Sequence, residues 1–190
     1  MAPQELLDFW FGAPGSPERG KPRTAWFKKS DAFDQEVRER FQPAYELAAG
    51  GQLAAWHETP HALLALIIVY DQFPRNMFRN DARAFATDAQ ALAAAERMVD
   101  LGWDMQLAPI ERQFAYLPFE HAEDMAMQQR SLELFERVTE DPALANIPAW
   151  ARKHFDVIAR FGRFPHRNAI LGRASTPEEI EFLQQPGSSF

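Results

Sequence analysis

The chain has 190 residues, of which 46% are hydrophobic and 25% are charged, and its formal net charge is −7. This composition supports a sizeable buried core and argues against intrinsic disorder. The negative charge argues against a protein devoted to nucleic acid or to anionic membranes, because phosphate contacts require a basic surface. Since the sequence contains no cysteine, it excludes disulfides, iron–sulfur clusters, thiolate zinc sites and a cysteine nucleophile.

Signals for targeting are not evident in the sequence. Residues 1–15 lack the basic region that begins a signal peptide. The best apolar run, residues 63–70, is much shorter than the roughly 20 residues that a membrane-spanning helix requires. We therefore expect a cytoplasmic protein that does not bind membranes and that forms one all-helical domain over residues 1–190.

Helix signals recur along the chain, and no convincing strand does. Residue types that favour N-caps, several of them followed by proline or by a capping-box side chain, stand at Ser30, Thr59, Thr87 and Thr176. The apolar run at 63–69 predicts a central buried helix, although its Ile-Ile-Val part is also typical of a strand. We predict helices over residues 3–11, 31–48, 60–72, 88 to about 102, 109–117, 118–139, 148–161 and from 177. Eight or nine such helices with short connections predict an all-α fold of antiparallel helix pairs.

Two segments repeat a pattern in which Phe-Pro and then Arg-Asn follow a predicted helix. Residues 71–79 are DQFPRNMFR, and residues 161–173 are FGRFPHRNAILGR. Because proline disfavours helical geometry at the residue before it, each helix is expected to end at or before the phenylalanine. The arginines then either bind the carbonyl groups of the helix ends or converge on an anion, which the planar guanidinium group suits. In the second interpretation the ligand-binding residues are Arg75, Asn76, Arg79, Arg163, His166, Arg167 and Asn168.

A candidate catalytic segment is YLPFEHAED, residues 116–124. Pro118 predicts that this stretch forms the first turns of a helix, where the helix dipole favours carboxylates. Glu120, His121 and Asp124 would then be neighbours on that helix, an arrangement suited to general acid–base catalysis or to a metal site. The competing interpretation is a solvated or arginine-paired helix start. We predict these three residues as acid–base groups and assign no metal and no cofactor.

Charge is segregated between two neighbouring segments. Residues 111–141 hold eight acidic and three basic side chains, whereas residues 150–173 hold six basic and one acidic. If their helices pack antiparallel, the resulting network is partly structural and also shifts the pKa values of nearby histidines. The facing groups would be Glu120, Glu123 and Asp124 on one side and Arg160, Arg163 and Arg167 on the other.

The segment HETPH, residues 57–61, matches a zinc-protease pattern in its letters alone. That chemistry needs both histidines on one face of a continuous helix. Pro60 removes a backbone donor and disfavours helical geometry at Thr59, so a helix begins at this point and does not run through it. We therefore do not predict a metalloprotease.

Several longer motifs resemble those of one bacterial family. They are LDFWFG, DQFPRNMFR, AFATD, ERQFAYLPFEHAED, RFGRFPHRNAILGR and the terminal GSSF, and the resemblance covers residues 5–190. In these motifs the chain resembles the domain-of-unknown-function family nine-two-four. The resemblance implies a tetratricopeptide-like α-α superhelix, and it brings no established activity, substrate or catalytic residue. At Ala122 the chain departs from the serine associated with the family.

Two functions remain open at the level of the sequence. The first is a small-molecule enzyme or binding protein whose polar pocket holds an anionic ligand with the arginines named above. The second is a scaffold that binds a protein or peptide partner in a concave groove, as helical stacks often do. The first predicts a closed polar site, and the second predicts a contiguous apolar strip on one face.

Overall fold

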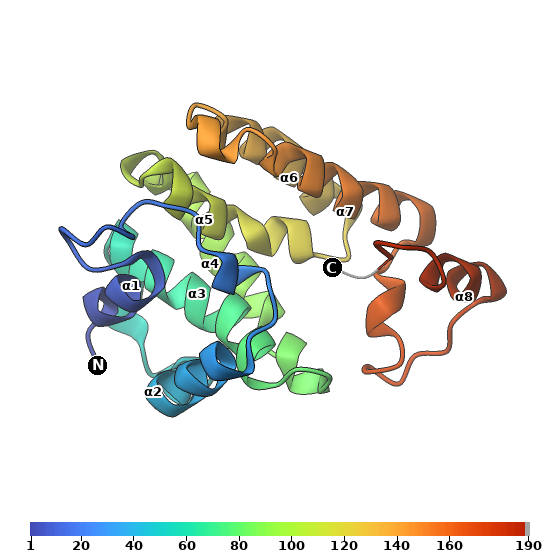
Figure 1. Ribbon diagram of the computed structural model, residues 1–190, viewed down its shortest axis with the longest axis horizontal. Coiled ribbons are helices and arrows are strands. Elements are labelled where there is room, and N and C mark those ends of the chain that lie inside the picture. The colour runs from blue at the N-terminus through green and yellow to red at the C-terminus, as the bar shows by residue number, and fades with distance from the viewer. Residues whose placement is uncertain (189–190) are drawn as a thin grey trace.

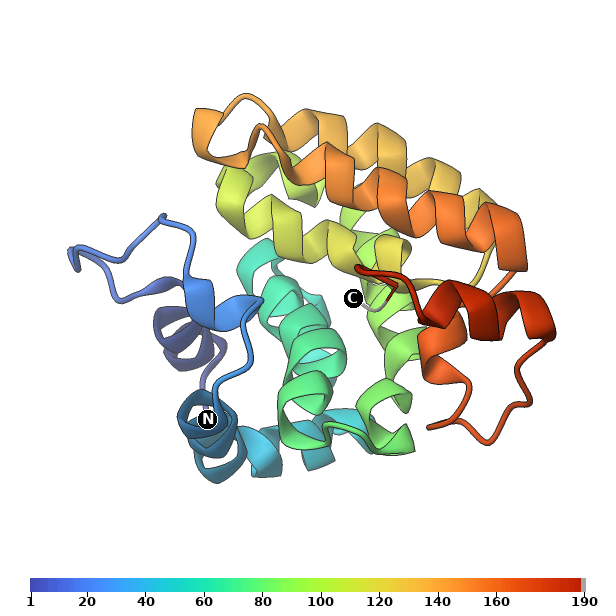
Figure 2. The same ribbon diagram turned by 45° about the vertical axis from the view of Figure 1, so that its right-hand side comes forward.

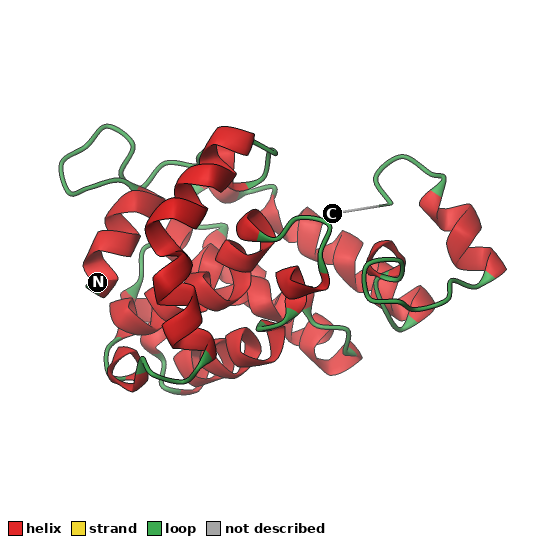
Figure 3. Cartoon of the chain, turned by 90° about the horizontal axis from the view of Figure 1, so that it is seen from below, coloured by secondary structure: helices red, strands yellow, loops and turns green. Residues whose placement is uncertain are grey.

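The computed structural model describes residues 1–188, and within that range it contains helices and no strand (Figures 1 and 3). Ser189 and Phe190, which end the GSSF motif, lie outside the described residues. The helices are α1 (Pro3–Phe11), α2 (Asp31–Ala49), α3 (Pro60–Met77), α4 (Asp88–Asp100), α5 (Pro109–His121), α6 (Met125–Phe135), α7 (Ile147–Phe161) and α8 (Pro177–Leu183). The expectation of an all-α fold with eight or nine helices is confirmed. No helix among the described residues combines the length and the apolarity needed to cross a membrane.

Several predicted helix starts are confirmed in atomic detail. The hydroxyl of Ser30 accepts a hydrogen bond from the Phe33 amide, and the hydroxyl of Thr59 accepts one from Ala62. Thr176 and Glu179 form the predicted capping box at the start of α8. These side chains satisfy amide groups that have no partner within the helix, which is why such sequences fix helix boundaries locally.

Helix α3 is the centre of the fold. It packs against α1, α2, α4 and α5, and its residues 63–69 are completely buried. Trp10 of α1 packs against Phe73 of α3 in a tilted contact and against Phe114 of α5 in an edge contact. A helix that is apolar on nearly every side is stable only when other elements cover all of it, so the predicted central position of this segment is confirmed.

Helices α5, α6 and α7 form a second group on one side of α3 and α4. Each of them packs against the next along the chain, and α6 and α7 lie side by side (Figures 1 and 2). Helix α7 ends at Phe161, and Gly162 follows with a φ of 68°, as expected for a left-handed C′ residue. Residues 162–188, the C-terminal segment, carry a 3₁₀ turn, η7 (Pro165–Arg167), and α8, at one end of the molecule.

The expectation that the helix before Phe73-Pro74 ends at the phenylalanine is wrong. Helix α3 continues through Pro74 to Met77. Proline cannot donate to the Tyr70 carbonyl, but the hydroxyl of Thr87 donates to it at 2.6 Å. Thr87 therefore does not cap α4 as expected, because its side chain satisfies the carbonyl group that the proline leaves open.

The expectation that Pro118 starts a new helix is also wrong. Pro118 lies inside α5, and the chain leaves helical geometry at Ala122. Helix α6 begins only at Met125, where Asp124 is the N-cap and accepts a hydrogen bond from the Met127 amide at 3.0 Å. The segment YLPFEHAED thus covers the end of one helix and the start of the next.

Candidate functional site

The centre of the site is a hydrogen bond between Asp71 and His121. Asp71 lies on α3 and is 1% exposed, while His121 is the last residue of α5. His121 Nδ1 lies 2.7 Å from Asp71 Oδ1. Arg75, one helical turn after Asp71, places Nη1 at 3.3 Å from the same oxygen, and Gln72 donates to the other oxygen at 2.6 Å. The contact joins residues that are 50 positions apart in the sequence.

Electrostatics keep Asp71 ionised and His121 neutral. Burial raises the pKa of Asp71, but the charge of Arg75 and the hydrogen bonds from His121 and Gln72 outweigh it, so the pKa falls well below its usual range. Burial, assisted by Arg75, lowers the pKa of His121 despite the attraction of Asp71. An ionised carboxylate can only accept a hydrogen bond, so Nδ1 of the neutral imidazole carries the proton. The other ring nitrogen, Nε2, therefore has a free lone pair in this tautomer.

Two arginines from distant segments meet at one carboxylate next to this pair. Arg75 binds both oxygens of Asp88, at 2.7 and 3.0 Å, and Arg167 from η7 lies 3.4 Å from one of them. The side chains of His121, Arg75 and Asp88 are 15%, 20% and 24% exposed, so this corner reaches the solvent. The predicted convergence of the two Phe-Pro segments therefore holds for Arg75 and Arg167.

A second buried pair, Glu120 and His154, lies behind His121. Glu120 Oε1 is 3.3 Å from His154 Nδ1, and that nitrogen also donates to the Trp150 carbonyl at 2.9 Å. Burial and the charge of Asp71 raise the pKa of Glu120 to about 8, and burial lowers the pKa of His154 to about 3. Near neutral pH both groups are uncharged, and uncharged groups can be buried at a much lower cost in free energy than charged ones.

The other predicted ligand-binding residues lie at different places. Arg79 and Asn76 both bind Asp34 on α2, and with it they line a hollow of about 400 Å³ between α2 and the end of α3. Arg163 binds both oxygens of Glu179, at 2.6 and 2.8 Å.

His166 and Asn168 accompany Arg167 in the C-terminal segment. Burial and Arg167 lower the pKa of His166 to about 4. Asn168 donates to Ser175 and to Glu179, so it holds its own segment together. Of the seven predicted ligand-binding residues, Arg75 and Arg167 share the Asp88 carboxylate, and His166 is close enough for both to act on its pKa.

The three predicted catalytic residues do not all lie together either. His121 contacts Asp71, and Glu120 is buried beside it. Asp124 is exposed and caps α6, and because α5 ends at His121 it does not share a helical face with Glu120. The expected pairing across the helices is also different, since Glu123 binds Arg173 with two hydrogen bonds of 2.6 and 2.9 Å.

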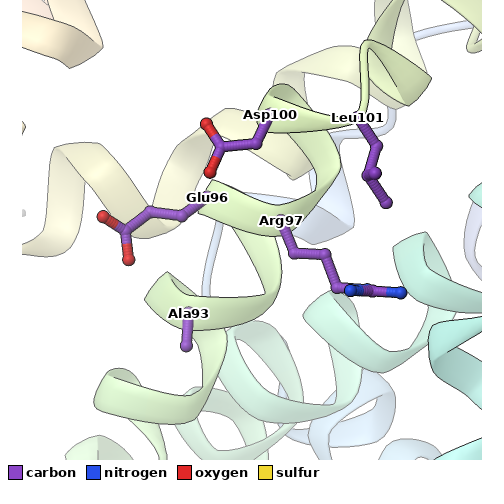
Figure 4. A pocket seen from close by; sticks show the side chains of 5 residues that line it. All are labelled: Ala93, Glu96, Arg97, Asp100 and Leu101. Atoms are coloured by element: carbon purple, nitrogen blue, oxygen red, sulfur yellow. The ribbon is translucent and has the colours of Figure 1, made fainter.

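Two hollows of the surface lie away from this site. One of about 400 Å³ lies on α4, where Glu96 and Asp100 extend on one side and Arg97 on the other (Figure 4). Neither this hollow nor the one beside Arg79 is lined by His121 or Arg167. Within the described residues, no group of three or more histidine and acidic side chains could hold a metal ion.

Sequence reasoning missed Asp71 and Asp88, which hold the site together. Asp71 is the first residue of the segment DQFPRNMFR, four residues before Arg75. Because the helix was expected to end by Phe73, the sequence did not predict that these two residues share a helical face. Asp88 lies in the first turn of α4, directly after Thr87. Its position opposite Arg75 and Arg167 depends on how α3, α4 and η7 pack, and no local pattern encodes that.

Comparisons with known proteins agree with this fold. The model of a family described as "Bacterial protein of unknown function (DUF924)" matches residues 6–187. A solved structure of a protein of unknown function from Agrobacterium tumefaciens, ATU0120, is similar, with 40% sequence identity, 96% of each chain covered and a TM-score of 0.83. A search of curated proteins finds no match.

Proposed function

Because the chain belongs to the bacterial family of unknown function DUF924, we propose its function from the geometry of the site. The protein binds a small anionic molecule, and His121 acts on that molecule as a general base. The observation that carries this proposal is the 2.7 Å hydrogen bond between Asp71 and His121 in a partly exposed corner beside two arginines.

The tautomer and the protonation state of His121 support its role as a base. Asp71 fixes the tautomer by accepting from Nδ1, so Nε2 is the basic nitrogen. A lowered pKa keeps that nitrogen unprotonated at neutral pH. A carboxylate that orients a histidine and stabilises its protonated form is a recurring device of enzymes that transfer protons. Asp71 is accordingly a positioning residue, and His121 is the group that meets the substrate.

The arginines supply the preference for an anion. Arg75 and Arg167 both approach Asp88, and Arg75 also approaches Asp71. The histidines and Glu120 add no charge near neutral pH. Small molecules that carry a carboxylate or phosphate group match the hydrogen-bonding edge of a guanidinium. We propose a cytoplasmic location for this activity.

The scaffold with a tetratricopeptide-like groove stays a prediction from the sequence. Among the described residues, the large apolar side chains that are exposed are spread over many elements, and α8 alone among the helices carries two of them, Ile180 and Leu183. Examples are Phe27, Met105, Trp150 and Ile180. We therefore rank binding and proton transfer above it.

Turnover of a defined metabolite mixture tests the proposal. The wild-type protein is incubated with small carboxylates and phosphate esters, and mass spectrometry follows which compounds disappear. We expect His121→Gln to slow that turnover by at least about 100-fold, since general base catalysis contributes at least that much. Asp71→Asn is expected to slow it as well, because the neutral amide accepts from Nδ1 more weakly than a carboxylate does, and its NH2 group can donate to Nδ1 and favour the other tautomer.

His61→Gln is the matched control, because His61 lies at the start of α3 with a half-exposed side chain. It is expected to retain wild-type turnover. Equal rates for the wild type and His121→Gln, or no turnover of any compound by the wild type, would contradict the proposed function.

A further inference from the structure

The guanidinium group of Arg167 is buried and incompletely paired. Arg167 is 6% exposed, and its Cζ lies 4.8 Å from the ring centre of Phe85 and 4.5 Å from that of Phe164. These rings stabilise a cation through their π-systems, but they offer no oxygen acceptor. The hydrogen-bonding edge of the group is therefore what a ligand can use.

The acceptors within reach do not saturate that edge. Its contact with Asp88, at 3.4 Å, is long, and Arg75 already binds both oxygens of that carboxylate at shorter distances. Within residues 1–188, Arg167 Nε has no hydrogen-bond partner although it is fully buried. A buried donor without an acceptor is unfavourable, and a buried charge with poor pairing more so. A ligand oxygen can supply the acceptor that residues 1–188 do not provide.

We propose that Arg167 binds a carboxylate group of the substrate, with Nε and one Nη donating to its two oxygens. This inference rests on the proposed function and narrows its substrate class to small carboxylic acids. A single planar carboxylate fits the fork of a guanidinium with two parallel hydrogen bonds. The bound group lies beside Arg75, whose positive charge also favours it.

The charges around Arg167 favour a carboxylate over a phosphate. Three acidic side chains act electrostatically on Arg167: Asp71, Asp88 and Glu123. They oppose the burial and the charge of Arg75, which together lower the pKa of Arg167 to about 10. A doubly charged phosphate is attracted twice as strongly to the two arginines but is also repelled twice as strongly by the three carboxylates, and it loses more hydration in a buried site than a singly charged carboxylate does. His121 is near enough for Arg167 to lower its pKa, so the carboxylate is held close to the base.

Nuclear magnetic resonance of arginine Nε–H groups tests this inference directly. Acetate, succinate and inorganic phosphate are titrated into ¹⁵N-labelled protein at constant ionic strength, with sodium chloride as the reference salt. We expect a saturable shift of the Arg167 signal with the carboxylates and weaker binding of phosphate. Contacts between this proton and the rings of Phe85 and Phe164 assign the signal without any variant.

Two variants complete the experiment. Arg167→Lys keeps the charge but removes the planar fork, and we expect it to weaken carboxylate binding about tenfold or more. Arg163→Lys is the matched control, since Arg163 lies in the same segment and is bound by Glu179; it is expected to bind as the wild type does.

Three results would overturn the inference: no saturable shift with either carboxylate, tighter binding of phosphate, or equal loss in both variants. Turnover that depends on His121 without a carboxylate response at Arg167 would reject the substrate class and leave the proposed function standing. A carboxylate response at Arg167 without turnover that depends on His121 would support carboxylate binding and contradict the proposed catalytic role of His121.

Discussion

Glu120 shows how the environment of one residue determines its chemistry. Its sequence context indicates an acidic group at a helix start, but the fold buries it at the end of α5, where it is 4% exposed. Burial and the charge of Asp71 raise the pKa of Glu120 to about 8, so its carboxyl group is protonated at neutral pH. Local sequence identified the residue, and only tertiary packing decided its protonation state.

The raised pKa of Glu120 makes stability depend on pH in a defined direction. Between pH 4.5 and about 8, the folded state holds this proton and the unfolded state does not, so the free energy of unfolding falls as the pH rises. The pKa of His154 is lowered to about 3, so below pH 6.5 this residue makes the free energy of unfolding rise with pH. Between pH 4.5 and 6.5 the contributions of Glu120 and His154 therefore offset each other. The decrease in the free energy of unfolding due to Glu120 is therefore measurable between pH 6.5 and 8.

We predict that Glu120→Gln removes this loss. Glutamine has the same shape and does not titrate, so the variant should retain about 2 kcal/mol more of its pH 6 stability at pH 9 than the wild type does. Urea unfolding at both pH values measures the difference. Glu133→Gln, at an exposed position on α6, is the control and should follow the wild type. A parallel decline in Glu120→Gln and the wild type would contradict the pKa assignment.

At the scale of elements, one side-chain hydrogen bond joins the start of α4 to α3. Pro74 removes the amide that would normally bind the Tyr70 carbonyl, and Thr87, which is 2% exposed, donates to that carbonyl instead. The bond lets α3 continue to Met77 and thereby keeps Asp71 and Arg75 on one helical face. An apparent helix terminator in the sequence is thus accommodated by a threonine from the next element.

We predict that Thr87→Val destabilises the protein by about 1–2 kcal/mol, because it leaves a buried carbonyl without its donor. In a Pro74→Ala background the restored amide can bind Tyr70, so the same substitution should cost much less. Chemical denaturation of the four proteins in this double-mutant cycle measures the coupling. Thr139→Val removes a hydrogen bond near the surface and should cost at most about 0.5 kcal/mol. Equal costs of Thr87→Val in both backgrounds would show that the hydroxyl does not replace the proline's missing donor.

At the scale of the whole molecule, the C-terminal segment is attached to α7 by a small apolar cluster and to the loop after α5 by polar contacts. Its own apolar cluster consists of Phe164 and Phe182 with residues of α7, separate from the main core. Glu123 connects it to the body by accepting from the Phe164 amide at 2.7 Å and from Arg173. Because Arg167 belongs to this segment, the site is complete only while the segment is in place.

We predict that Glu123→Gln loosens this attachment without unfolding the core. Loss of the charged hydrogen bonds to Arg173 should speed amide hydrogen exchange in residues 163–183 by about tenfold or more, with α3 unchanged. Hydrogen exchange followed by mass spectrometry measures both regions. Glu178→Gln breaks an exposed ion pair with Arg160 and should have little effect. Faster exchange throughout α3 would mean that the segment and the core open together.

The sequence by itself determined the helical class, most helix starts and the buried centre, because capping, proline chemistry and apolar periodicity act within a few residues. It also pointed to Arg75, Arg167, Glu120 and His121. Only the tertiary structure decided that Asp71 holds His121 and that Asp88 is shared by two arginines, since these contacts join residues 50 and up to 79 positions apart. The same packing sent Arg79, Arg163 and Asp124 to other partners. The residue type fixes the sign of each charge, but the partner of each charge depends on which helices pack together and where each helix ends.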